Sequence, residues 1–202
     1  YSREMTPPWP SFVRSIPSPW PTLWPGPDVS RKEIYHQALT LNQQYFKIEA
    51  SELFLEYQPL WPTDWEWLRD TLTACLVTGR VFRGEPLITR WHRLTAFPHP
   101  QETVIQRCAE FYRQQWFTEI EVQQLLATGF TAMRQFLKTP PQPSSLAIGY
   151  ANYDGFPYLY YTIQTDLSVD ELVALDELHN QLLVAGHFKH RLLDSIIITF
   201  EP

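Results

Sequence analysis

The sequence predicts an α+β protein: a mainly helical body with an extended Pro/Trp-rich N-terminal arm and a small C-terminal β-β-α-β antiparallel-sheet unit. Three observations support this prediction. Capping boxes precede amphipathic segments, prolines gather in two stretches, and Asp154-Gly155 separates two segments rich in tyrosine and β-branched residues, as in a hairpin. We therefore expect an arm at 1–27, a helical body at 28–138, a Pro-rich linker at 139–144 and an acidic β-β-α-β unit at 145–202.

The arm holds eight of the 18 prolines and three of the eight tryptophans, namely Trp9, Trp20 and Trp24. Proline fixes φ and lacks a backbone donor, so we expect an extended, polyproline-like chain. Because exposed indoles are costly in water, the arm should dock on its own domain or on a partner. One expected docking surface is the aromatic set around Trp67, for which plain core filling is the alternative.

Four capping boxes mark expected helix starts: Ser30 with Glu33, Thr63 with Glu66, Thr118 with Glu121, and Ser168 with Glu171. The first helix should reach about residue 49, and residues 50–57 either continue it or form a second helix. On the helix after Thr63 we expect Trp65 to face the core, so that Trp67 points to solvent or into a groove. Gly79 suits the left-handed position past this helix.

The next segments follow from their prolines and periodicity. Residues 80–99 are expected to form a short hairpin or irregular structure, because Pro86 interrupts the pattern. Pro100 suits the first turn of a helix, and the longest amphipathic stripe follows Thr118.

The C-terminal unit is expected to pair a hairpin with a last strand at 195–200, under a helix that ends at Gly186. Alternation along the second strand places Tyr158 and Tyr160 on one face and Leu159 on the other. A tyrosine-rich, lysine-free sheet face is suited to binding a protein partner, and less suited to RNA because residues 145–202 carry the whole net charge of −6.

The basic residues form one island, made of Arg80, Arg83, Arg90 and Arg93 with His92 beside them. This island could bind an anionic small molecule or an acidic patch of a partner, or pair with acids of its own fold. Residues 1–144 are neutral overall, which disfavours general binding to nucleic acid.

A possible metal site consists of His179, His187 and His190, with Asp176 and Glu177 nearby. The competing interpretation is one histidine at the border of the apolar stripe and two exposed ones near a helix end. No glycine-rich phosphate loop, GxSxG motif or CxxC spacing is found, so we expect no cofactor.

The two cysteines, Cys75 and Cys108, lie on apolar helix faces and are expected to be buried thiols. Free thiols and the lack of any long apolar run indicate a cytoplasmic, soluble protein without a transmembrane segment. Together these features favour a non-enzymatic assembly factor, adaptor or accessory subunit that binds a protein partner or its own copies. A small metal-dependent enzyme or small-molecule binder using the late His/acid cluster is the alternative.

Overall fold

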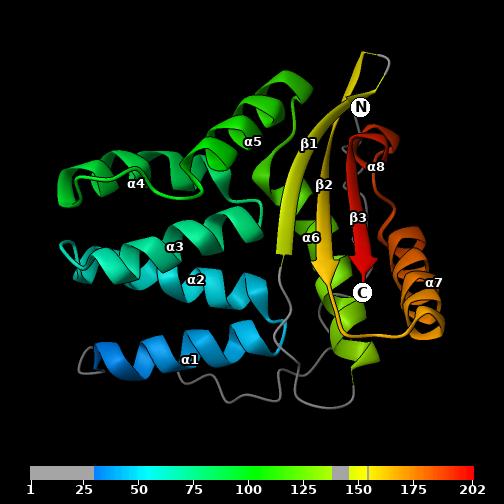
Figure 1. The fold of residues 1–202 in the computed structure, drawn as a ribbon, viewed down its shortest axis with the longest axis horizontal. Helices are drawn as coiled ribbons and strands as arrows, with labels where there is room; N and C mark the ends of the chain where they lie inside the picture. The colour runs from blue at the N-terminus through cyan, green and yellow to red at the C-terminus, as the bar shows by residue number, and fades with distance from the viewer. Residues whose placement is uncertain (1–29, 138–145, 154) are drawn as a thin grey trace, which may run out of the picture.

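The computed structural model describes residues 30–137, 146–153 and 155–202 (Figure 1). The predicted arm with Trp9, Trp20 and Trp24, and the predicted linker at 139–144, lie outside these residues. The described helical body contains, in order, α1 (Arg31–Gln43), α2 (Lys47–Tyr57), the 3-10 helix η2 (Gln58–Leu60), α3 (Trp65–Val77), α4 (Val81–Leu94), α5 (Glu102–Gln115) and α6 (Glu119–Phe136). The C-terminal part contains β1 (Leu146–Tyr153), β2 (Phe156–Gln164), α7 (Val169–Gly186), α8 (His190–Ser195) and β3 (Ile196–Glu201). The α+β prediction is thus confirmed.

Three of the four predicted capping boxes form, at Ser30, Thr118 and Ser168. The fourth prediction, at Thr63, is wrong because the helix begins one residue later: the Asp64 carboxylate caps α3 and accepts a hydrogen bond of 3.0 Å from the backbone of Trp67. A carboxylate at this position also complements the positive end of the helix dipole.

The first helix stops earlier than predicted, at Gln43. Tyr45 has a φ of 60°, which breaks the helical path, and α2 then starts at Lys47 as a separate helix. The end of α3 agrees with the prediction: Gly79 has a φ of 72°, and the backbone of Arg80 bonds back to Cys75 at 2.7 Å. This bond satisfies a carbonyl that would otherwise have no hydrogen-bond partner at the end of the helix.

The prediction of a hairpin or irregular structure at 80–99 is wrong, because α4 occupies most of this segment and contains Pro86. Its buried residues Val81, Gly84, Ile88 and Trp91 recur at three- and four-residue spacing. Burial of this stripe offsets the missing proline donor, which alone would disfavour a helix.

The sheet is mixed rather than antiparallel, with the strand order β1-β2-β3. The predicted hairpin forms: β1 and β2 are antiparallel, Tyr153 pairs with Phe156, and Gly155 has a φ of 84°. However, β3 runs parallel to β2, because α7 and α8 carry the chain back to the starting end of β2 before β3 begins.

One buried cluster spans both the helices and the sheet, and includes Leu72, Phe111, Met133, Tyr161 and Leu175. In Figure 1, α6 lies behind the strands and α7 beside them. A second, smaller cluster lies between α1, α2 and α3 and consists of Ile34, Ala38, Leu53, Phe54 and Trp67. The sheet therefore packs one of its faces on the main core.

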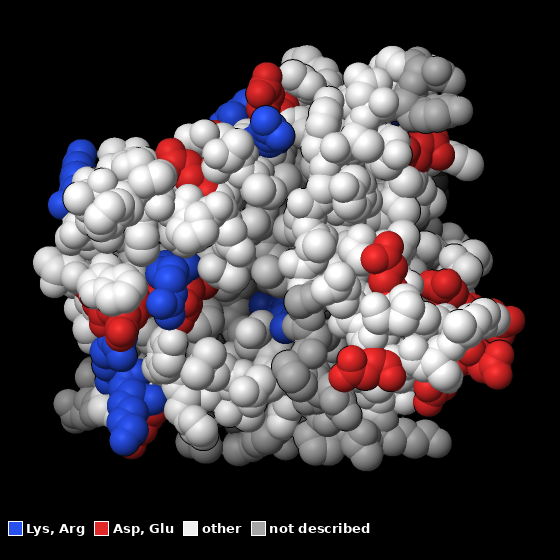
Figure 2. All heavy atoms as spheres, in the orientation of Figure 1, with Lys and Arg blue, Asp and Glu red and all other residues white. Residues whose placement is uncertain are grey.

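Charged side chains are unevenly distributed over the molecule. Figure 2 shows acidic groups gathered on the side where α7 lies, and basic groups mainly over the helical body. The exposed acids of α7 include Asp170, Glu171, Asp176 and Glu177. Between these regions, the surface above β1 and β2 carries almost no charge (Figure 2).

Candidate interaction surface

The strands present two chemically different faces, as their alternation predicts. Leu159, Tyr161 and Ile163 of β2 point to the buried core. The opposite face, here called the outer sheet face, consists of Ala147, Gly149 and Ala151 of β1, Phe156, Tyr158, Tyr160, Thr162 and Gln164 of β2, and Ile197, Thr199 and Glu201 of β3. Among these eleven residues only Glu201, at the end of β3, is charged, and no described helix lies in front of them in Figure 1.

Tyr160 lies at the centre of the outer sheet face. Its ring crosses β1 directly over Gly149, where an added Cβ would lie 1.9 Å from the ring atom Cζ. Because Gly149 has no side chain, the ring has room to lie across β1.

Tyr160 also pairs with Ile197 across the parallel strands, so Gly149, Tyr160 and Ile197 form one row across the sheet. Tyr160 is 37% exposed and Ile197 is 40% exposed. The next row is fixed by the hydroxyls of Thr162 and Thr199, whose oxygens are 3.1 Å apart. The strand pairing thus creates a platform with an aromatic centre, whose one charged residue, Glu201, lies at its edge.

The tip of the hairpin extends this platform. Phe156 has the same strand parity as Tyr158 and Tyr160 and is 77% exposed. Tyr158 is half-buried. The predicted assignment of Tyr158 and Tyr160 to one face, opposite the buried Leu159, agrees with the structure.

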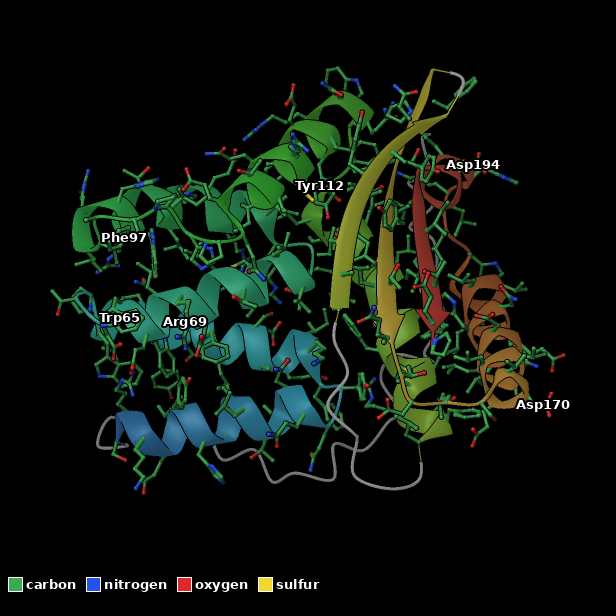
Figure 3. All side chains as sticks on the ribbon, viewed as in Figure 1. Trp65, Arg69, Phe97, Tyr112, Asp170 and Asp194 are labelled. Carbon is green, nitrogen blue, oxygen red and sulfur yellow. The ribbon has the colours of Figure 1, made fainter. Side chains whose placement is uncertain are left out.

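Trp67 lies in the core, and the prediction that it points to solvent or into a groove is wrong. It is fully buried, and its indole Nε1 donates a hydrogen bond of 3.0 Å to the carbonyl of Phe54. Trp65, predicted to face the core, is instead exposed at the start of α3. It lies near Arg69 and Phe97 in Figure 3. The reason is that α3 is covered on two sides, by α2 and by α4, so that its buried arc is wider than a single stripe.

The four predicted arginines do not form one patch. Arg80 is buried and pairs with Glu52 at 2.8 Å, whereas Arg83 is exposed with Glu119 at 3.8 Å. Arg90 donates to the carbonyl of Pro62 and to the side chain of Gln58, both at 3.0 Å. Arg93 is exposed at the other end of α4.

The three histidines of the predicted metal site lie in different surroundings. His179 is buried on α7, with its Nε2 3.0 Å from the hydroxyl of Thr128 and its ring against Phe200. His187 and His190 are exposed beyond the end of α7. Across residues 30–137, 146–153 and 155–202, no three His, Cys, Asp or Glu side chains are grouped so that they could hold a metal ion.

The cysteines agree with their prediction as buried thiols. Cys75 and Cys108 are both free, and burial raises the pKa of each thiol to about 12. Neither thiol is therefore ionised near neutral pH, which makes both poor nucleophiles.

Sequence reasoning missed the two residues that complete the platform. Gly149 and Ile197 become neighbours of Tyr160 only through the strand register, and the parallel pairing of β3 was not predicted. The available signal was a glycine inside a predicted strand, which often marks a close approach of another group.

No helix in the described part of the chain is both long and apolar enough to cross a membrane. Comparison with protein-family models, curated proteins and solved structures finds no match, so the candidate surface stands on its geometry alone.

Proposed function

We propose that this chain is a non-enzymatic protein-interaction protein, an adaptor, assembly factor or accessory subunit, which binds a protein partner through the outer sheet face. The observation that supports this proposal is the platform centred on Tyr160, whose ring lies over Gly149 and beside Ile197, with no charged residue in these three positions. Ordered aromatic and aliphatic side chains at the centre of a patch supply most of the binding energy in protein interfaces.

The area of the platform indicates which part of such an interface it would form. Three strands about 4.8 Å apart and six residues long cover roughly 300 Å². A standard interface buries about 800 Å² on each partner. The outer sheet face would therefore form the centre, and Phe156 with the surrounding surface would form the rim.

Two further elements belong to this proposal. The tryptophans of the N-terminal arm, Trp9, Trp20 and Trp24, would provide a second contact, on the ground of their composition. A cytoplasmic setting accords with two reduced, buried cysteines.

The test is a charge placed on the platform, compared with the same charge elsewhere. Ile197→Lys introduces an ammonium group next to Tyr160 at a position that is 40% exposed, whereas Val173→Lys alters a valine on α7 that is somewhat more exposed, at 53%. Both variants are used in quantitative cross-linking and affinity capture from the native cells, and self-association is measured by sedimentation velocity.

The expected result is one partner, or self-association, retained by wild type and Val173→Lys and reduced about tenfold or more by Ile197→Lys. Tyr160→Ser should reduce the same contact. If Ile197→Lys is folded and still recovers every partner at the wild-type level, the outer sheet face is not the binding surface.

A further inference from the structure

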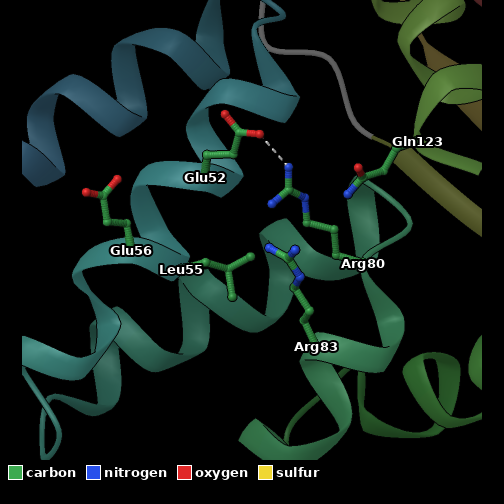
Figure 4. Close-up of a pocket in the computed structure, with 6 residues that line it drawn as sticks. All are labelled: Glu52, Leu55, Glu56, Arg80, Arg83 and Gln123. Atoms are coloured by element: carbon green, nitrogen blue, oxygen red, sulfur yellow. Dashed lines mark hydrogen bonds and ion pairs between the residues drawn. The ribbon is translucent and has the colours of Figure 1, made fainter. Parts of the chain in front are cut away.

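A pocket of about 380 Å³ lies between α2, α4 and α6, and it is independent of the outer sheet face. Figure 4 shows the six residues that line it: Glu52, Leu55, Glu56, Arg80, Arg83 and Gln123. Glu52 and Glu56 lie one turn apart on the same side of α2. Arg80 and Arg83 lie at the start of α4, and Gln123 comes from α6.

Arg80 is an unusual wall residue because it is only 4% exposed. One of its terminal nitrogens, Nη2, donates to Glu52 at 2.8 Å. Its Nε is buried, and within the described part of the chain nothing accepts a hydrogen bond from it. A buried, charged donor without an acceptor is costly, so this guanidinium is incompletely satisfied by the described residues.

Arg83 adds a second positive charge to the same wall. In Figure 4 its guanidinium is directed towards that of Arg80. Its ion-pair partner, Glu119, has Oε2 3.8 Å from the Arg83 Nε, beyond hydrogen-bond length, while Oε1 of Glu119 accepts from the backbone N–H groups of Phe82 at 2.6 Å and Arg83 at 3.1 Å. Two converging guanidinium groups with unused donors form a receptor for a carboxylate, which they can bind through paired hydrogen bonds.

The opposite wall has the opposite charge. Glu56 lies across the pocket from Arg80 and Gln123 in Figure 4, and Leu55 lines the space between. No ion pair involves Glu56 among the described residues, unlike Glu52, which Arg80 neutralises. The lining thus carries two guanidinium groups at one end, Leu55 in between, and Glu56 at the other end, where its carboxylate is directed away from the two arginines in Figure 4.

We propose that this pocket binds a small zwitterion of the amino-acid type, with its carboxylate on Arg80 and Arg83 and its ammonium group on Glu56. A simple anion would leave the carboxylate of Glu56 without a counter-charge, and a simple cation would lie close to the guanidinium group of Arg83. Only a ligand that carries both charges complements the whole lining, and the volume matches small-molecule sites, which begin at roughly 300 Å³.

The experiment is isothermal titration of the full-length chain at low salt with four probes. These are 4-aminobutyrate, which carries both charges, butyrate, butylamine and inorganic phosphate. Three variants are compared: Arg83→Gln and Glu56→Gln in the pocket, and Arg93→Gln as a matched control on the same helix outside it. All three positions are exposed, so each variant should fold.

The expected result is that wild type and Arg93→Gln bind 4-aminobutyrate about tenfold more tightly than butyrate or butylamine. Arg83→Gln should weaken the binding of both 4-aminobutyrate and butyrate. Glu56→Gln should weaken the binding of 4-aminobutyrate, to the level of butyrate, and of butylamine, and should leave butyrate unchanged. Binding of phosphate or butyrate at least as tight as 4-aminobutyrate, with no effect of Glu56→Gln, would overturn the proposal in favour of a plain anion site. Absence of binding by all four probes would overturn it altogether.

Discussion

Trp116 combines a backbone conformation that favours glycine with an indole that lies in solvent. It ends α5 with φ 57° and ψ 36°, and it is 83% exposed. The left-handed conformation costs an L-residue about 1–2 kcal/mol, and an exposed side chain recovers little of this by burial. Backbone bonds on either side hold the residue in place, including that from Phe117 to the carbonyl of Tyr112 at 2.9 Å.

We predict that Trp116→Gly is more stable than Trp116→Ala by about 1 kcal/mol, because both variants remove the indole and only glycine relieves the backbone strain. Urea denaturation followed by circular dichroism measures the difference. Equal stability of the two variants would show that the backbone at this position carries no strain.

His179 is a titratable group buried in its uncharged form. The Thr128 hydroxyl donates to the carbonyl of Leu125 at 2.6 Å, so its oxygen is left to accept from the Nε2–H of His179. Burial lowers the pKa of His179 to about 4. Its ordinary value is about 6.5, so the unfolded chain takes up a proton on this residue before the folded chain does.

Stability should therefore fall as the pH decreases from about 6.5 towards 4, by up to about 3 kcal/mol from this residue alone. His179→Gln keeps an N–H donor for Thr128 and cannot titrate, so its stability should depend less on pH in this range. The free energy of unfolding is measured at intervals between pH 4 and 7. His187→Gln, at an exposed site, serves as the control with the wild-type slope, and a wild-type slope in His179→Gln would refute the assignment.

At the scale of the element, α3 depends on a cap that also ties it to α1. Asp64 accepts from the backbone of Trp67 and forms an ion pair with Arg31. Burial acts to raise the pKa of Asp64, but the hydrogen bonds from Arg31 and from Trp67 outweigh it and lower the pKa. The charged carboxylate is thus the form that the fold stabilises.

We predict that Asp64→Ala destabilises the protein by about 1–2 kcal/mol, whereas Thr63→Ala changes stability by less than about 0.5 kcal/mol. Asp64→Asn should fall between them, because asparagine still caps a helix but cannot pair with Arg31 as an anion. Thermal or urea unfolding of the three variants separates these cases. A larger loss of stability in Thr63→Ala than in Asp64→Ala would show that Thr63, and not Asp64, caps α3.

The helical elements show which signals in the sequence were sufficient. Local chemistry identified Ser30, Thr118, Ser168 and Gly79, since each acts within a few residues of its own backbone. For α4, Pro86 argues locally against a helix, although the three- and four-residue spacing of the residues that become buried is present in the sequence. The exchange of Trp65 and Trp67 could not be resolved locally, because it depends on α3 being covered from two sides.

The sheet divides in the same way between local and long-range information. Alternation placed Tyr158 and Tyr160 on one face, and the turn at Gly155 fixed the hairpin. The direction of β3 depends on where α7 and α8 return the chain, which is a property of tertiary packing. The row of Gly149, Tyr160 and Ile197 follows from that packing. The sequence therefore predicts the tyrosines of the candidate surface but not the neighbours of Tyr160 on β1 and β3.

At the scale of the whole molecule, the helices and the sheet share one buried core. Its polar link is the contact between the phenols of Tyr112 on α5 and Tyr161 on β2, whose oxygens are 3.1 Å apart. Figure 3 labels Tyr112 between α5 and the strands. Burial raises the pKa of both phenols, so both are neutral near neutral pH and can share this hydrogen bond.

This contact provides a test of whether the helical body and the sheet unfold together. Tyr161→Phe leaves the Tyr112 hydroxyl buried without its partner and should cost about 1–3 kcal/mol. In Tyr112→Phe/Tyr161→Phe both hydroxyls are gone, so the double variant should lose less than the sum of the single losses. Hydrogen exchange read by mass spectrometry should show the Tyr161→Phe loss equally in the most protected amides of α6 and β2, because one core stabilises both. Wild-type protection in α6 with loss confined to the strands would mean that the sheet opens as a separate unit, despite the apolar side chains that it shares with the helices.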